Sequence, residues 1–166
     1  SWNGTLYGIP QTIHPHVLWY RKDLYSDPQV MADYKAKTGS ELTPPATMDE
    51  WHEQVKFFNE MEYDGQTIYG WAAQAAKGFG NVHTWLSFLY SYDGSAFNED
   101  FTQSTLSSPE SVAATEQWAE MMKYMPPGSS SFTYDNVTTA AQQGTVATAL
   151  QWSWGAFAVD DPSSSQ

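Results

Sequence analysis

The sequence predicts an α/β fold that is rich in helix and contains a small mixed sheet. Three observations lead to this prediction. Several segments carry capping residues ahead of a helical apolar repeat, short apolar runs suited to strands lie between them, and the two kinds of segment alternate along the chain. Because 166 residues suit one domain with a sizeable core, we expect a single folding unit.

Two strands are expected before the first helix. Residues 4–10 carry two apolar side chains and end at Pro10, which cannot donate to a sheet. Residues 12–20 form the second strand, and Pro15 favours an edge position or a bend for it.

Two capped helices are expected next. Asp27 is the N-cap of the first helix, which should run from residue 28 to about 37 and end at Gly39. The second helix begins with Thr47 and Glu50, which have the spacing of a capping box. Its apolar side chains repeat at i, i+4 and i+7, at Trp51, Val55 and Phe58.

The middle of the chain is expected to hold a strand, a loop and a helix. A turn at residues 64–65 leads into a strand at residues 67–71. The Gly- and Ala-rich residues 74–80 form a loop that can approach a ligand closely. Asn81 can cap the following helix, whose expected apolar face consists of Val82, Trp85, Leu86 and Leu89.

Two more helices and a strand complete the expected order. Ser108 opens a helix whose expected core positions are Val112, Ala119 and Met122. Asp135 or Asn136 caps a short helix at residues 137–143, which Gly144 closes.

The last strand ends on two tryptophans, Trp152 and Trp154. Side chains two residues apart on an extended segment point to the same face, so both indoles should project to one side. Such a pair is either core filler or a flat wall for a ligand ring. We interpret it as a wall, because the helix closed by Gly144 makes the strand begin abruptly beneath it.

The composition limits the classes of partner. The formal net charge is −12 with only 7 Lys and Arg, so the clustered cations that a nucleic-acid binder needs are missing, and anionic membranes are disfavoured. Aromatic residues make up 16 % of the chain, which is common in proteins that bind neutral polar molecules with flat apolar faces. No apolar run approaches the roughly 18 residues of a membrane span, and the absence of Cys excludes thiolate metal sites.

Six motifs and a helix follow one another along the chain, in the order LYGIP, WYRKDL, PPATMDEW, YGW, SYDGSAF, the helix, and AAQQGTVATALQWSW. In their order and spacing they resemble the family 1, or maltodextrin-type, extracellular solute-binding proteins of ABC sugar importers. Three positions depart from the family's pattern. The usual proline–threonine–x–x–glutamate–tryptophan segment is changed a little at residues 45–51, Asp93-Gly94 stands where a double glycine is usual, and Ala147-Thr148 where alanine–methionine is common.

The resemblance implies a type II periplasmic-binding-protein-like lobe, present here as a partial domain. Family members have two lobes joined by a hinge, and they hold sugar in the cleft between the lobes. Residues 1–20 would be the hinge-crossing strands, residues 21–159 the C-terminal-type lobe, and residues 160–166 a polar tail toward a return crossing. We therefore expect this chain to be a piece of a longer periplasmic or extracytoplasmic bacterial protein, with a sugar or polyol ligand and the membrane permease as partners.

The resemblance also implies a set of cleft-facing residues with amide, imidazole or indole side chains. They are His14, Trp71, Gln74, Asn81, His83, Trp152 and Trp154. A pyranose has an apolar C–H face and a rim of hydroxyls, so such side chains suit it. The alternatives remain open that Asn81 is only a helix cap and that the two tryptophans fill the core.

Other functional classes fit the sequence less well. A glycoside hydrolase needs two opposed carboxylates, whereas the Asp and Glu residues here lie in caps, turns and helix faces. A stand-alone carbohydrate-binding module or lectin is usually all-β, whereas capped helices dominate here. His14 and His16 have the spacing of a metal pair but lack a third convergent ligand. We expect a binding protein without catalytic activity, cofactor or metal.

Overall fold

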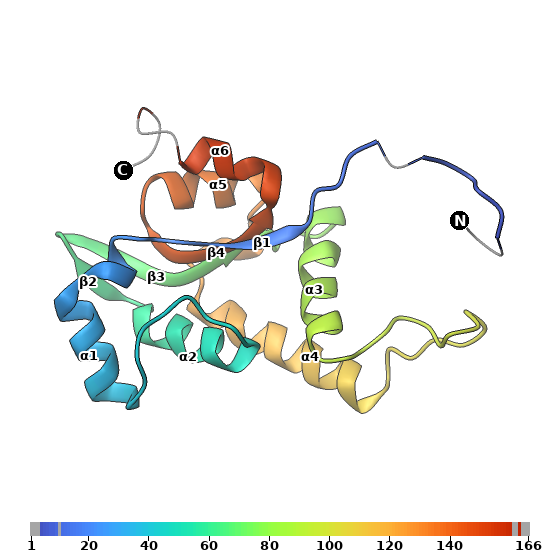
Figure 1. Ribbon diagram of the computed structural model, residues 1–166, viewed down its shortest axis with the longest axis horizontal. Helices are drawn as coiled ribbons and strands as arrows, with labels where there is room; N and C mark the ends of the chain where they lie inside the picture. The colour runs from blue at the N-terminus through green and yellow to red at the C-terminus, as the bar shows by residue number, and fades with distance from the viewer. Residues whose placement is uncertain (1–3, 10, 161–162, 164–166) are drawn as a thin grey trace.

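A four-stranded mixed sheet carries helices on both faces in the computed structural model, which describes residues 4–9, 11–160 and 163 (Figure 1). In sheet order the strands are β1 (His16–Tyr20), β4 (Val146–Trp152), β3 (Gln66–Ala73) and β2 (Met61–Tyr63). β3 and β4 run parallel, whereas β1 and β2 pair antiparallel to their neighbours at the two edges. This arrangement confirms the helix-rich α/β fold and the small mixed sheet.

The helices divide between the two faces of the sheet. α5 and α6 lie on one side, and α2 and α4 on the other, with α3 beside the end where β1 begins (Figure 1). The bounds are α1 (Pro28–Thr38), α2 (Met48–Phe58), α3 (Phe79–Ser91), α4 (Pro109–Met121), α5 (Tyr134–Gln142) and α6 (Ala156–Val159). Short 3₁₀ turns occupy Leu24–Ser26, Met122–Tyr124, Ser129–Ser131 and Ser153–Gly155. No helix in the described part of the chain has the length and hydropathy needed to cross a membrane.

Local capping chemistry explains the helices that the sequence predicted best. The Asp27 carboxylate accepts two backbone N–H groups of the first turn of α1, and Gly39 ends that helix at φ 81°. At α2, Thr47 and Glu50 form the predicted capping box. The predicted apolar side chains of α2 are buried against the sheet: Trp51, Val55 and Phe58.

Several predicted elements differ from the structure. Residues 4–9 form no strand, and this segment extends away from the sheet (Figure 1); Pro10 lies outside the described residues. β1 begins at His16 rather than at residue 12, because Pro15 cannot donate to β4. β2, which the sequence analysis did not predict, pairs with β3 across the predicted turn at residues 64–65.

The predicted apolar faces of two helices were right in part: Leu89 is buried, and Trp85, Leu86 and Met122 pack against the core. On α3 the buried residues are Thr84, Phe88 and Leu89, and on α4 they are Ser111, Ala114, Trp118 and Met121. Val82 and Val112, which were expected in the core, are exposed. α5 begins three residues earlier than predicted, because Thr133 and Asn136 form its capping box.

Candidate functional site

The parallel strands β3 and β4 end at the same edge of the sheet, and a buried amide pair holds their ends together. Gln74 Nε2 donates to Gln151 Oε1 at 2.9 Å, and the same oxygen accepts the backbone N–H of Trp152 at 3.0 Å. Gln74 is only 8 % exposed. Its predicted contact with a ligand is therefore wrong for this structure, because its side chain fixes the strand ends instead.

The role of this amide pair can be tested through protein stability. Gln151→Leu should lower the free energy of unfolding by about 1–3 kcal/mol, because the buried Gln74 amide loses its acceptor. Urea unfolding followed by circular dichroism measures the change. Gln103→Leu is the matched control, since Gln103 is exposed, and it should stay within about 0.5 kcal/mol of the parent. Equal stability of the two variants would contradict a structural role for the pair.

The start of α3 lies directly against the end of β3. A Cβ at Gly80 would overlap the Gln74 amide oxygen, so only glycine allows this approach. Asn81 lies inside the first turn and donates from Nδ2 to the Ala75 carbonyl at 2.8 Å. The prediction that Asn81 caps the helix is wrong, because Gly78 holds the N-cap position without a side-chain hydrogen bond. Asn81 instead ties the preceding loop to the helix.

Four aromatic side chains from three elements meet at this edge, and we call them the aromatic wall: His16 from β1, Phe79 and His83 from α3, and Trp152 from β4. The His16 and Trp152 ring centroids lie 4.0 Å apart at an interplanar angle of 63°. His83 lies 5.3 Å from Trp152 and 3.9 Å from Phe79. Phe79 is 73 % exposed, and His83 and Trp152 are half-buried. The wall is therefore open to solvent.

Trp154 is separate from this group. It lies in the 3₁₀ turn Ser153–Gly155, so the two tryptophans do not share one face of an extended strand, and that prediction is wrong. Its indole stacks on Tyr134 at 4.4 Å and 15°, and His14 lies 6.5 Å away at its edge. Trp154 is 47 % exposed. Neither Trp152 nor Trp154 is core filler.

Trp71, another predicted site residue, lies in the core. Its exposure is 0 %, and its Nε1 donates to the Met121 carbonyl at 2.7 Å. Its ring packs edge-to-face on Trp51 and on Trp118, at 5.0 and 5.5 Å. The prediction that Trp71 contacts a ligand is wrong, because no part of its surface is accessible.

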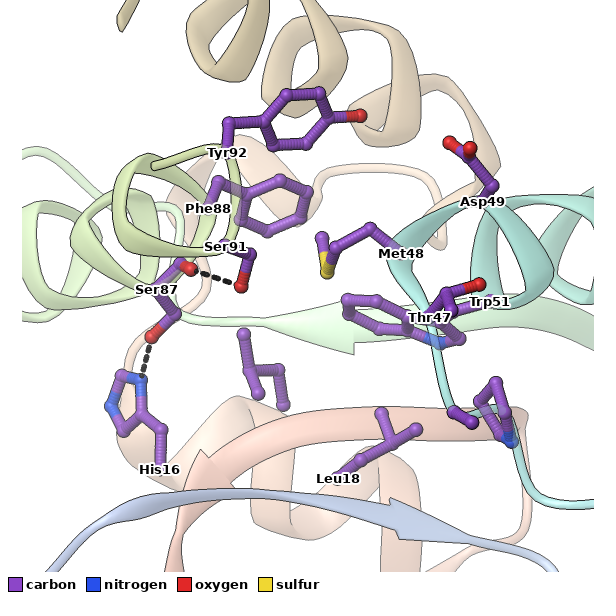
Figure 2. Close-up of a pocket in the computed structure, with 13 residues that line it drawn as sticks. His16, Leu18, Thr47, Met48, Asp49, Trp51, Ser87, Phe88, Ser91 and Tyr92 are labelled. Atoms are coloured by element: carbon purple, nitrogen blue, oxygen red, sulfur yellow. Dashed lines mark hydrogen bonds between the residues drawn. The ribbon is translucent and has the colours of Figure 1, made fainter. Parts of the chain in front are cut away.

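A cavity of about 660 Å³ lies beside the wall, between the start of α2, the second half of α3 and β1 (Figure 2). None of the seven predicted site residues lines it. Figure 2 shows Met48 and Trp51 on one side, Ser87 and Ser91 on the other, and Leu18 below them. The polar side chains serve the fold: Trp51 Nε1 donates to Thr148, and Ser91 Oγ donates to the Ser87 carbonyl. The first of these hydrogen bonds holds α2 in place against β4, and the second lies within α3.

The wall combines flat apolar faces with polar edges. Among the described residues, the Trp152 indole nitrogen and His83 Nε2 in the wall have no hydrogen-bond partner within the protein, nor does the indole nitrogen of the separate Trp154. Burial, and to a smaller extent the neighbouring His83, lowers the pKa of His16 below its ordinary value. The described residues contain no group of three His, Asp or Glu side chains placed to hold a metal ion. This arrangement can stack on a ring and exchange hydrogen bonds with hydroxyls.

Sequence reasoning missed two members of the wall. His16 was considered only as half of a metal pair, although its position on the edge strand places it opposite Trp152. Phe79 stood in a segment expected to be loop, and its only signal was an aromatic residue directly after Gly78. The structure brings both together with the predicted His83 and Trp152.

The whole chain, residues 1–166, matches the family model described as bacterial extracellular solute-binding protein. It is similar to the ABC transporter solute-binding protein from Agrobacterium radiobacter K84 in complex with ribitol, with a TM-score of 0.77 and 25 % identity over 100 % of this chain and 38 % of that one. It is also similar to maltose-bound T. maritima MalE3, with a TM-score of 0.69 and 25 % identity over 90 % of this chain and 35 % of that one.

The solute-binding protein from Agrobacterium vitis S4 with bound D-mannitol shares the fold, with a TM-score of 0.73 and 21 % identity over 92 % of this chain and 34 % of that one. The chain thus spans between 34 and 38 % of the length of these three proteins.

Proposed function

The chain belongs to the family of bacterial extracellular solute-binding proteins, and from this premise we propose that it supplies one wall of the ligand site in the binding protein of an ABC importer. The proposed ligand is a neutral sugar or polyol. The proposed partner is the membrane permease that accepts this ligand, and the proposed location is outside the cytoplasm. The ribitol, D-mannitol and maltose in the names of the similar structures support the ligand class.

The observation that carries the proposal is the place of the aromatic wall. It lies at the carboxyl ends of the parallel strands β3 and β4, where open α/β sheets bind their ligands. Its exposed rings suit the C–H face of a sugar, and the indole and imidazole nitrogens suit hydroxyl groups. The four side chains of the wall include no Asp, Glu, Lys or Arg that could pair with a charged ligand, so we propose an uncharged ligand.

We also propose the division of the chain that the resemblance implied. Residues 1–20 would cross the hinge and enter the lobe as β1, residues 21–159 would form the lobe, and residues 160–166 would lead toward a return crossing. Residues 1–3, 10, 161–162 and 164–166 lie outside the described residues.

We propose that the chain binds its ligand without converting it. Glycoside hydrolysis needs two carboxyl groups that flank the bond to be cleaved. The four side chains of the aromatic wall include neither Asp nor Glu, which supports binding without catalysis.

The proposal is tested by thermal shift and calorimetry on the native protein that contains this chain. Maltose, ribitol and D-mannitol are the probes, and glucose 6-phosphate is the charged control. Binding of at least one neutral probe should raise the melting temperature by mass action, whereas the control should leave it unchanged. Release of glucose from maltose, or binding of the phosphate alone, would contradict the proposal.

A mutation tests the part of the site around Trp154. Trp154→Ala should weaken binding of the neutral probe by about 3- to 10-fold, because the stacking surface is lost, and should lower the melting temperature by less than about 2 °C at a half-exposed position. Phe157→Ala is the matched control, since Phe157 is 85 % exposed and lies outside the wall. A large fall in melting temperature for Trp154→Ala would show that the indole is structural.

A further inference from the structure

His16 connects β1 to α3 through two hydrogen bonds in series. Its Nδ1 lies 2.9 Å from Ser87 Oγ, and Ser87 Oγ donates to the backbone carbonyl of His83 at 3.2 Å (Figure 2 shows the first of these bonds). A serine hydroxyl has one proton to donate. Because that proton goes to the His83 carbonyl, Ser87 accepts from His16. This pair of bonds favours the tautomer of His16 that carries its ring proton on Nδ1.

The other nitrogen of the ring is bare. His16 Nε2 is buried and has no hydrogen-bond partner among the described residues. A second proton there would place a positive charge in a partly buried position beside His83, and both effects lower the pKa of His16. The neutral ring with its proton on Nδ1 is thus the form that this surrounding favours.

This ring lies against Trp152. The two residues face each other in the antiparallel pairing of β1 with β4, and their rings meet edge-to-face at 4.0 Å. Among the described residues, the indole nitrogen of Trp152 has no hydrogen bond to hold it. The orientation of the indole therefore depends on the rings packed around it, and His16 is the nearest of those measured.

We propose that His16, held by Ser87 with its proton on Nδ1, is a positioning residue that sets the orientation of the Trp152 indole. The sugar-stacking purpose of that orientation rests on the proposed function, whereas the positioning itself does not. The hydrogen bond joins the edge strand to α3, so it also fixes the spacing between His83 and Trp152.

Nuclear magnetic resonance of the sugar-free protein tests the positioning. Long-range ¹⁵N–¹H spectra should show His16 protonated on Nδ1. Ser87→Ala should remove this preference and move the indole N–H resonance of Trp152. Ser91→Ala is the matched control: Ser91 lies one turn further along α3, donates only to the Ser87 carbonyl, and should leave both signals unchanged.

Two substitutions at His16 separate the ring from the hydrogen bond. His16→Asn can still donate to Ser87 but lacks the ring, and His16→Phe keeps a ring but cannot donate. Each should move the Trp152 signal, because the proposal needs both parts. A His16 protonated on Nε2, or a Trp152 signal that Ser87→Ala and His16→Phe leave in place, overturns the inference.

Binding of the neutral probe gives the second measurement. Ser87→Ala and His16→Phe should each weaken it by about 3- to 10-fold, the effect of one lost hydrogen bond, with a melting temperature close to that of Ser91→Ala. Unchanged affinity with a moved indole signal would overturn the sugar-stacking purpose of that orientation. Failure of the unmodified protein to bind any neutral probe overturns the proposed function instead, and the sugar-free spectra then decide the inference by themselves.

Discussion

Replacing Trp71 by alanine should lower the free energy of unfolding by about 3–5 kcal/mol, the usual cost of removing a large buried ring. Trp71 has no exposed surface and lies between Trp51 and Trp118. Alanine would leave a cavity among aromatic rings and leave the Met121 carbonyl without its indole donor. Chemical unfolding of the native protein measures the loss.

Two further measurements serve as controls for this prediction. Trp71→Phe should recover part of the stability, since it restores a ring but not the hydrogen bond. Where Trp71→Ala stays folded, its affinity for the neutral probe should remain within a few-fold of the parent. A Trp71→Ala variant with unchanged stability but no binding would show that Trp71 belongs to the ligand site.

Trp152→Ala should affect ligand binding more than stability, the reverse of what we expect for Trp71→Ala. We expect it to weaken binding of the neutral probe by about 10- to 100-fold, equivalent to roughly 1.4–2.8 kcal/mol, because a central aromatic anchor carries much of the binding energy. The loss of stability should be smaller than for Trp71→Ala, because Trp152 is half-buried at the end of β4. Calorimetry gives the affinity, and thermal unfolding gives the stability.

The variant Trp152→Phe separates the two contributions of the indole, its stacking face and its N–H donor. Trp152→Phe keeps a stacking face but loses the N–H donor, so its affinity should lie between those of the parent and Trp152→Ala. Binding that survives Trp152→Ala unchanged would contradict the aromatic wall as the ligand site.

The sequence was a good guide wherever a few neighbouring residues determine the structure. The cap at Asp27, the capping box of Thr47 and Glu50, and the helix end at Gly39 depend on local hydrogen bonds and backbone angles. A last strand that leads into Trp152 was also predicted, and β4 ends at that residue. These features need no information about distant parts of the chain.

The predictions failed where contacts between elements that are distant in the sequence determine the structure. Trp71 lies within β3 and Trp152 is the last residue of β4, and only the packing of α2 and α4 shows that the first is core and the second is accessible. The 3₁₀ turn that separates Trp154 from Trp152 depends on a close approach, because a Cβ at Gly155 would meet the Tyr134 hydroxyl at 2.5 Å. No local pattern in the sequence reports that approach.

Candidate polar residues were misplaced for the same reason. Gln74 pairs with Gln151, which lies 77 residues away in the chain, and so serves the fold. His16 reaches Ser87 across 71 residues. Pairings of this kind are set by the order of strands in the sheet and by the packing of α3 beside β1, which the sequence alone did not supply.

The central claim is that a neutral sugar or polyol binds at the aromatic wall, and a titration of the ¹⁵N-labelled native protein tests it most directly. Maltose, ribitol and D-mannitol are added in turn while the indole N–H signals are followed. We predict that Trp152 and Trp154 respond to at least one of these compounds, whereas the buried Trp71 and the cavity-lining Trp51 do not. A response confined to Trp51, or none from any indole, would contradict the claim.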